Sequence, residues 1–124
     1  MSGTTLLVIL ISVTLSAVAQ AAFKVGVSSP TAQQAMSSGD WKVVVLALGL
    51  SPAIITGFAL YGIGTVLWLS ALAKTQLSQA YPFVSLGFLL TAAIGFYWFN
   101  DAMSWSRASG NALVIAGVCL VARS

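Results

Sequence analysis

The sequence contains no histidine and no glutamate, only two aspartates (Asp40 and Asp101), and a single cysteine. Enzyme sites are usually built from paired carboxylates, histidine bases, activated nucleophiles or clustered metal ligands. These residues supply neither such a site nor a glycine-rich phosphate loop. We therefore expect no enzyme activity, no metal and no cofactor. The single Cys119 cannot form an internal disulfide, and its apolar surroundings indicate a small packed residue.

Charged residues are also scarce, at 6% of the 124 residues against 59% hydrophobic residues. A soluble domain carries roughly a quarter charged residues. A chain this short could not bury so much apolar surface in a core of its own. The sequence therefore predicts an all-α integral membrane protein. Because the basic residues occur singly rather than in clusters, we expect no nucleic-acid partner.

Four apolar stretches are long enough to cross a hydrocarbon layer about 30 Å thick at about 1.5 Å per residue. They predict a single domain over residues 1–124, with spans near 4–23, 52–73, 81–99 and 107–122. The first stretch has an alternative interpretation as a signal peptide, since Ala17-Val18-Ala19 is similar to a cleavage site. It lacks the basic residues expected at the start of a signal peptide.

Two segments between the first and second spans need separate interpretations. Residues 25–40 are polar and rich in serine and glycine, so we expect a loop. The apolar run 41–73 would reach about 50 Å as one helix, which exceeds the hydrocarbon thickness. Ser51-Pro52 offers a break, because proline suits a first helical turn and restricts the residue before it. We therefore predict a short interfacial helix over residues 41–50.

A polar stripe runs along the first span. Its members recur every fourth residue and so share one helical face: Ser12, Ser16, Gln20 and Lys24. Polar side chains that face lipid are costly, so this stripe should face protein or a cavity. The alternatives are that the serines bond back to their own helix and that Lys24 extends to the interface. Ser16, Gln20 and Lys24 are predicted substrate-binding residues.

The second and third spans add aromatic and small residues. Gly57, Tyr61, Gly64 and Trp68 share one face of the second span. The glycines would let another helix or a lipid chain approach closely. The aromatics could equally serve helix packing and interfacial anchoring. The predicted substrate-binding set is completed by residues of both spans: Tyr61, Trp68, Tyr81 and Ser85.

The last turn and the fourth span carry the remaining candidates. Asp101 and Ser104 or Ser106 are predicted to cap the fourth helix, and Arg107 to anchor it. Gly110 and Gly117 lie seven residues apart, two turns along one face. This spacing indicates a helix–helix contact, and so small a bundle is expected to work as a dimer through it.

The basic residues do not fix the orientation. With four spans, both ends of the chain lie on one side together with Lys74 and Arg123. The opposite side carries Lys24, Lys42 and Arg107. Positive charge marks the cytoplasmic side only where it is clearly unequal, which is not the case here.

Several segments carry a family resemblance. The chain resembles the drug/metabolite transporter superfamily, in particular its small four-helix members, and is most similar to the subunits of the undecaprenyl-phosphate aminoarabinose flippase. The resemblance covers roughly the whole chain and is strongest from Pro52 to Val118. The segments that carry it are GFALYG at 57–62, VLWL at 66–69, LSQAYP at 77–82 and the glycines at 110 and 117.

The resemblance implies a multi-pass protein of the bacterial inner membrane that translocates a polyprenyl-phosphate-linked sugar. The partners it implies are membrane lipid and a second subunit, either identical or homologous. Lys24 or the start of the third span would bind the phosphate. Tyr61, Trp68 and Tyr81 would stack on the sugar. Related multidrug exporters use a glutamate in the first span, and Ser16 stands at that position here, so proton–cation exchange lacks its titrating group.

Two other functions are compatible with the sequence. The chain could be a drug or metabolite exporter with another coupling mechanism, which would bind cations on its aromatic residues. It could also be a membrane subunit that transports nothing and holds a partner enzyme. Each alternative would use the same four spans, because fold alone does not determine function.

Overall fold

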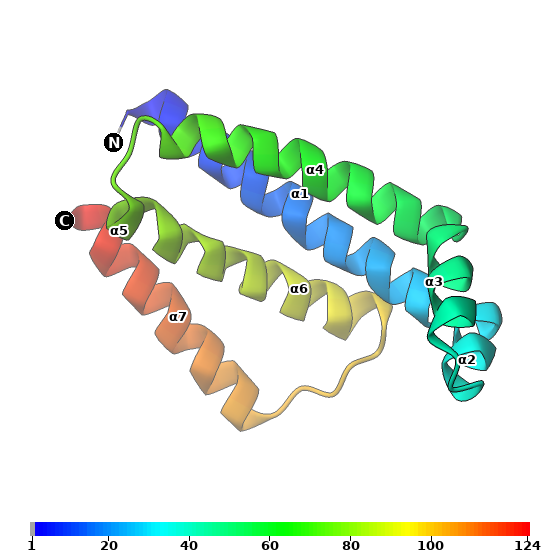
Figure 1. Ribbon diagram of the computed structural model, residues 1–124. Helices are drawn as coiled ribbons and strands as arrows, with labels where there is room; N and C mark the ends of the chain where they lie inside the picture. Colours follow the sequence, from blue (N-terminus) through cyan, green and yellow to red (C-terminus); the bar gives the residue numbers. More distant parts are fainter. Residues whose placement is uncertain (1) are drawn as a thin grey trace.

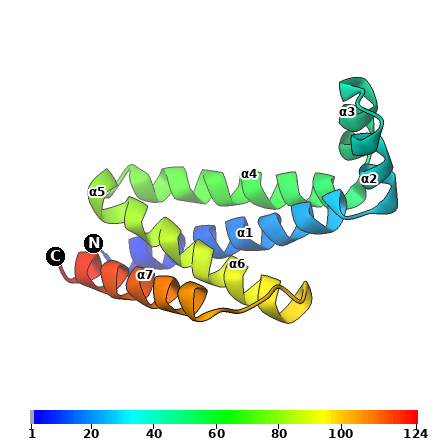
Figure 2. The ribbon, with the colours of Figure 1, turned by 90° about the horizontal axis from the view of Figure 1, so that it is seen from below.

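The structure, a computed structural model, describes residues 2–124, which form helices and contain no β-strand. Four helical segments are long and apolar enough to cross a membrane, which confirms the predicted all-α fold with four spans. Three of these segments are single helices: α1 (Gly3–Val27), α4 (Pro52–Leu72) and α7 (Trp105–Arg123). The remaining span consists of three consecutive elements, α5 (Leu77–Ala80), η1 (Tyr81–Phe83) and α6 (Val84–Trp98). Figures 1 and 2 show the two ends of the chain at the same end of the bundle.

Helices α1 and α4 form the closest pair, and glycines make this possible. A Cβ atom at Gly57 would lie 2.6 Å from the ring of Phe23 and 3.2 Å from the carbonyl oxygen of Ala19. A Cβ atom at Gly64 would lie 3.2 Å from the carbonyl oxygen of Ser12. The two backbones can approach this closely only because these residues lack side chains. The predicted close approach of a helix at the glycine face is therefore confirmed.

The buried core lies toward the end of the bundle that holds the chain ends, where α1, α4, α6 and α7 converge. Its buried residues are Ile9, Val13, Ala71, Ala80, Phe83 and Val118. Figure 1 shows α7 diverging from the bundle toward its own beginning. Among the described residues, no atom lies within 4 Å of a Cβ atom added at Gly110 or Gly117. The dimer contact through these glycines stays a prediction.

The expectation of a loop over residues 25–40 is wrong. Helix α1 continues to Val27, and α2 (Pro30–Ser37) follows almost at once. The hydroxyl of Ser29 accepts a hydrogen bond of 3.2 Å from the backbone N–H of Ala32. Serine before a helix and proline in its first turn are both favourable, because serine supplies an acceptor and proline has no N–H to satisfy. This Ser-Pro pair therefore begins a helix.

The short helix predicted over residues 41–50 is present as α3 (Trp41–Gly49). Asp40 caps it: its carboxylate accepts a hydrogen bond of 3.0 Å from the N–H of Lys42. The break before α4 also forms as predicted, with Ser51 as cap and Pro52 in the first turn. Figure 2 shows α2 and α3 lying across the long axis of the bundle. Trp41 at the start of α3 is 70% exposed. The placement of α3 in the membrane interface stays a prediction.

The third and fourth spans begin earlier than predicted. The third begins at Leu77 rather than Tyr81, so only a few residues form the polar turn. Within it, Tyr81–Phe83 form a 3₁₀ turn, where Pro82 lacks a backbone N–H. The fourth begins at Trp105, after the cap residue Ser104. The hydroxyl of Ser104 accepts a hydrogen bond of 3.1 Å from the N–H of Arg107.

Candidate functional site

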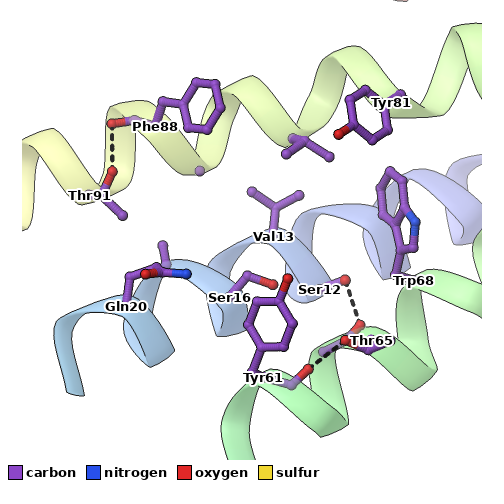
Figure 3. Close-up of a pocket in the computed structure, with 14 residues that line it drawn as sticks. Ser12, Val13, Ser16, Gln20, Tyr61, Thr65, Trp68, Tyr81, Phe88 and Thr91 are labelled. Carbon is purple, nitrogen blue, oxygen red and sulfur yellow. Dashed lines mark hydrogen bonds between the residues drawn. The ribbon is translucent and has the colours of Figure 1, made fainter. Parts of the chain in front are cut away.

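A groove runs along α1 between α4 and α6. Both helices pack on α1, whereas they scarcely contact one another. The groove measures about 680 Å³, within the range of small-molecule sites, roughly 300–1,000 Å³. Figure 3 shows α1 as its floor. The lining residues come from α1 (Ser12, Val13, Ser16, Ala17, Gln20), from α4 (Tyr61, Gly64, Thr65, Trp68) and from the third span (Tyr81, Val84, Gly87, Phe88, Thr91).

The floor of the groove is polar. Ser12 is buried, and its hydroxyl donates a hydrogen bond of 2.7 Å to the carbonyl oxygen of Gly64. Among the described residues, the side chains of Ser16 and Gln20 make no hydrogen bond. Thr14 of the same helix differs, because its hydroxyl donates a hydrogen bond of 2.8 Å to the carbonyl of Leu10. Ser16 and Gln20 therefore retain donors and acceptors that a ligand can use.

Aromatic rings define the end of the groove nearest the α4–α5 turn. The rings of Trp68 and Tyr81 meet edge to face, with centroids 6.4 Å apart and planes at 74°. Tyr61 is 45% exposed and Tyr81 is 62% exposed, so part of each ring is free. Figure 3 shows Tyr61 rising from α4 beside the polar floor. Such rings offer flat apolar faces with a polar edge, which suits both sugar rings and lipid.

The opposite end of the groove is charged. A second cavity of about 250 Å³ adjoins the first and shares Ala17, Gln20 and Thr91 with it. Lys24 from the last turn of α1 and Asp101 from the α6–α7 loop line this cavity. Together the two cavities lead from the aromatic end to an amine and a carboxylate. Within residues 2–124, no cluster of His, Cys, Asp or Glu is placed to hold a metal ion.

Asp101 lines the cavity and does not cap α7, so its predicted capping role is wrong, whereas the cap predicted at Ser104 is confirmed. Asn100 adopts a left-handed conformation (φ 55°), which ends α6 and turns the chain back. The N–H of Asp101 then donates a hydrogen bond of 2.9 Å to the carbonyl oxygen of Gly95. The carboxylate lies where a side chain at position 95 would stand. Arg107 instead donates a hydrogen bond to the carbonyl of Ala102 and so holds the loop.

The structure gathers most of the predicted substrate-binding residues. Five line the main groove, namely Ser16, Gln20, Tyr61, Trp68 and Tyr81. Lys24 lines the second cavity, as Gln20 also does. Ser85 lines neither cavity. The groove-facing side of α6 is set by Val84, Phe88 and Thr91, at i, i+4 and i+7, and Ser85 lies about 100° away from Val84 around the helix.

Two threonines that line the groove were not among the site residues predicted from the sequence. Thr65 and Thr91 line it from opposite walls, and Thr91 also lines the second cavity. Their hydroxyls donate to carbonyls of their own helices, at 2.8 Å to Tyr61 and 2.9 Å to Phe88. Because threonine satisfies itself in this way, its presence in an apolar span is a weak signal of a cavity. For Thr65 the available clue was its spacing of four residues from the predicted Tyr61.

Relatives of the chain carry a consistent set of names. A protein of Shewanella sediminis named "probable 4-amino-4-deoxy-L-arabinose-phosphoundecaprenol flippase subunit ArnF" is 32% identical over 126 residues, covering 94% of this chain and 86% of its own. The ArnF subunit of Erwinia tasmaniensis is 34% identical over 56% of each chain. The ArnE subunit of Hamiltonella defensa is 29% identical, covering 71% of this chain and 78% of its own.

No family model and no solved structure matches the chain. The likeness to the ArnF subunit of Shewanella sediminis nevertheless extends over nearly the whole chain. The four apolar helices make the chain a multi-pass membrane protein. The chain belongs to the family of ArnE and ArnF subunits of the 4-amino-4-deoxy-L-arabinose-phosphoundecaprenol flippase.

Proposed function

We propose that the chain is a subunit of a flippase that moves a polyprenyl-phosphate-linked amino sugar between the leaflets of the bacterial inner membrane. The observation that carries the proposal is the groove itself, which places a polar floor, aromatic rings and one amine within a bundle of apolar helices. A flippase substrate has the same division, with a polar head group and an apolar tail. The names of the relatives support this class of substrate.

The head group would lie on the polar floor. Ser16 and Gln20 have unused hydrogen-bonding groups, and sugar hydroxyls are both donors and acceptors. Tyr61 and Tyr81 expose ring surface on which a sugar can stack as it passes along the groove toward the charged end. The polar groups of the groove would thus take the place of the water that surrounds the head group outside the membrane. This exchange lowers the free-energy cost of carrying polar groups across the apolar layer.

The phosphate would bind the amine of Lys24. This lysine lies in the last turn of α1 and reaches the cavity at the charged end of the groove. Lysine binds phosphate as a point charge with three donors, and the exposed side chain of Lys24 is open to a ligand. The alternative in which Lys24 only extends to the interface predicts no effect of its removal on transport, so the two interpretations differ in a measurable way.

The polyprenyl tail would remain in lipid beside the groove. The groove lies between two walls that scarcely contact one another, α4 and α6. Phe88 on one wall is 61% exposed, and Phe58 and Val66 on the other helix are 66% and 67% exposed. These apolar surfaces can contact the tail while the head group lies on α1, so the tail need not enter the protein.

A second subunit would complete the transporter. The relatives are named as ArnE and ArnF subunits, which supports a partner of the same family. In the described chain α7 makes little contact, and Val118 is its one buried residue. A homologous four-helix subunit or a second copy packed on α7 would bury its exposed residues and enclose the substrate path between two bundles. The chain has no step to catalyse in this role.

The proposal is tested with purified protein in liposomes that contain a fluorescent short-chain polyprenyl-phosphate amino sugar. A quencher outside reports how fast the substrate reaches the outer leaflet. We expect faster exposure than in empty liposomes, strongly slowed in Lys24→Ala and largely retained in Lys24→Arg. Lys42→Ala is the control, because Lys42 lies on α3 outside both cavities.

The assay also separates the competing functions. If the chain alone is inactive, it is reconstituted with its homologous subunit, and inactivity of both preparations contradicts the proposal. Transport of quaternary ammonium compounds in place of the lipid-linked sugar would support an exporter. Stable association with one enzyme, without transport of either substrate, would support a non-transporting subunit. Equal rates in wild type and Lys24→Ala would remove the phosphate-binding role of this lysine.

A further inference from the structure

We infer that Asp101 binds the ammonium group of the transported sugar and so selects amino sugars over neutral ones. The inference rests on the proposed function and concerns the charged end of the same groove. Asp101 comes from the loop after α6, and Lys24 comes from α1. The two side chains line one cavity of about 250 Å³ together with Gln20 and Thr91.

The two charges share this cavity without neutralising each other. In the described part of the chain, the amine of Lys24 and the carboxylate of Asp101 form no ion pair within 4.0 Å, and neither side chain makes a hydrogen bond. A ligand with a phosphate alone would be attracted by the lysine and repelled by the carboxylate. A ligand that carries both a phosphate and an amine would satisfy both groups. The cavity therefore fits a head group with opposite charges at its two ends.

The backbone sets the position of Asp101 in the loop. The N–H of Asp101 bonds to the carbonyl of Gly95 at 2.9 Å, after a left-handed turn at Asn100. The carboxylate occupies the space that a side chain at position 95 would take. A change of charge at Asp101 need not disturb this turn, because the bond that holds it comes from the main chain. Substitution can therefore separate recognition from folding.

The other carboxylate of the chain provides a contrast. Asp40 accepts a hydrogen bond of 3.0 Å from the N–H of Lys42 and caps α3. It lines neither cavity. Asp40 thus has a structural task outside the groove, whereas Asp101 has none of its side-chain acceptors in use. An amino sugar supplies a charged donor to this exposed carboxylate, and a charge-assisted hydrogen bond of this kind is stronger than a neutral one.

The test compares two substrates in the liposome assay, a short-chain polyprenyl phosphate with an amino sugar and one with a hydroxyl in place of the amine. Wild type should move the amino form about tenfold faster, since a hydrogen bond to a charged group gives at least this difference. Asp101→Asn should lower the rate for the amino form to that for the neutral form. Asp101→Glu should retain the preference, and the control Asp40→Asn should leave it unchanged.

Each outcome supports or contradicts recognition of the amine by Asp101. Equal rates for the two substrates in wild type contradict the inference without any variant, and this measurement stands even if Asp101→Asn does not fold. A variant Asp101→Asn that slows both substrates equally, or that keeps the preference, assigns Asp101 a structural role and overturns the inference while the flippase function stands. If wild type, alone and with its homologous subunit, moves neither substrate, the proposed function fails and the inference fails with it.

Discussion

The hydroxyl of Ser12 donates a hydrogen bond of 2.7 Å to the carbonyl oxygen of Gly64, 52 positions later in the chain. This bond joins α1 to α4 where the absence of a side chain at Gly64 lets the two backbones approach. Both residues also line the groove. The α1–α4 contact and the floor of the candidate site therefore share residues. A substitution that weakens the contact should also alter the site.

Ser12→Ala should destabilise the protein by about 0.5–1.5 kcal/mol, the usual net value of one hydrogen bond. The matched control is Ser70→Ala, because the exposed hydroxyl of Ser70 bonds only to the carbonyl of Leu67 in its own helix. Thermal or denaturant unfolding in detergent measures both variants. Equal stability of the two would show that the bond between α1 and α4 contributes nothing measurable.

Gly57→Leu should destabilise the α1–α4 pair by about 1–3 kcal/mol, because a side chain there meets the ring of Phe23 and the carbonyl of Ala19. Gly62→Leu is the control: it lies in the same helix, and no described atom lies within 4 Å of its added Cβ. Both changes alter helix propensity alike, so the difference between their unfolding midpoints reports the contact. A smaller effect at Gly57 than at Gly62 would contradict the observed packing.

The sequence predicted the elements of the groove where one helix alone determines the geometry. The recurrence of Ser12, Ser16 and Gln20 every fourth residue places them on one face of α1 whatever surrounds it. The glycine face of α4 is determined in the same way, and both faces lie in the groove or at the α1–α4 contact. Helical periodicity is a local property, so it can be derived without knowing the neighbouring helices.

The break at Ser51-Pro52 was predicted, but two other features that depend on turns were not. Ser85 was assigned to the site by assuming one regular helix from Tyr81, but the chain begins that helix earlier and passes through a 3₁₀ turn. The location of Asp101 depends on the left-handed residue Asn100 and on the space at Gly95. A sequence does not show which of several polar residues in a short turn caps the next helix. Here Ser104 has that role.

Thr91→Phe should reduce transport of the lipid-linked sugar by tenfold or more without loss of folding. Thr91 lines both cavities, so a bulky ring there would block the way from the aromatic end to the charged end. Its hydroxyl bonds only to its own helix, at 2.9 Å to the carbonyl of Phe88, so no contact between helices is lost. Thr56→Phe is the control, since Thr56 is exposed on α4 and lines neither cavity. Equal transport by the two variants would show that the two cavities do not form one path.

Gly117→Cys in a Cys119→Ser background should form a disulfide-linked pair of subunits under mild oxidation. The reason is that α7 presents Gly110 and Gly117 on one face, with room for another helix. The unmodified chain is the control, because its exposed Cys119 lies about 200° around the helix from Gly117 and should not cross-link. Crosslinks at Cys119 alone would place the contact on the opposite face of α7. Expressing a tagged homologous subunit with the corresponding cysteine then distinguishes a pair of identical chains from a mixed one by the mass of the product.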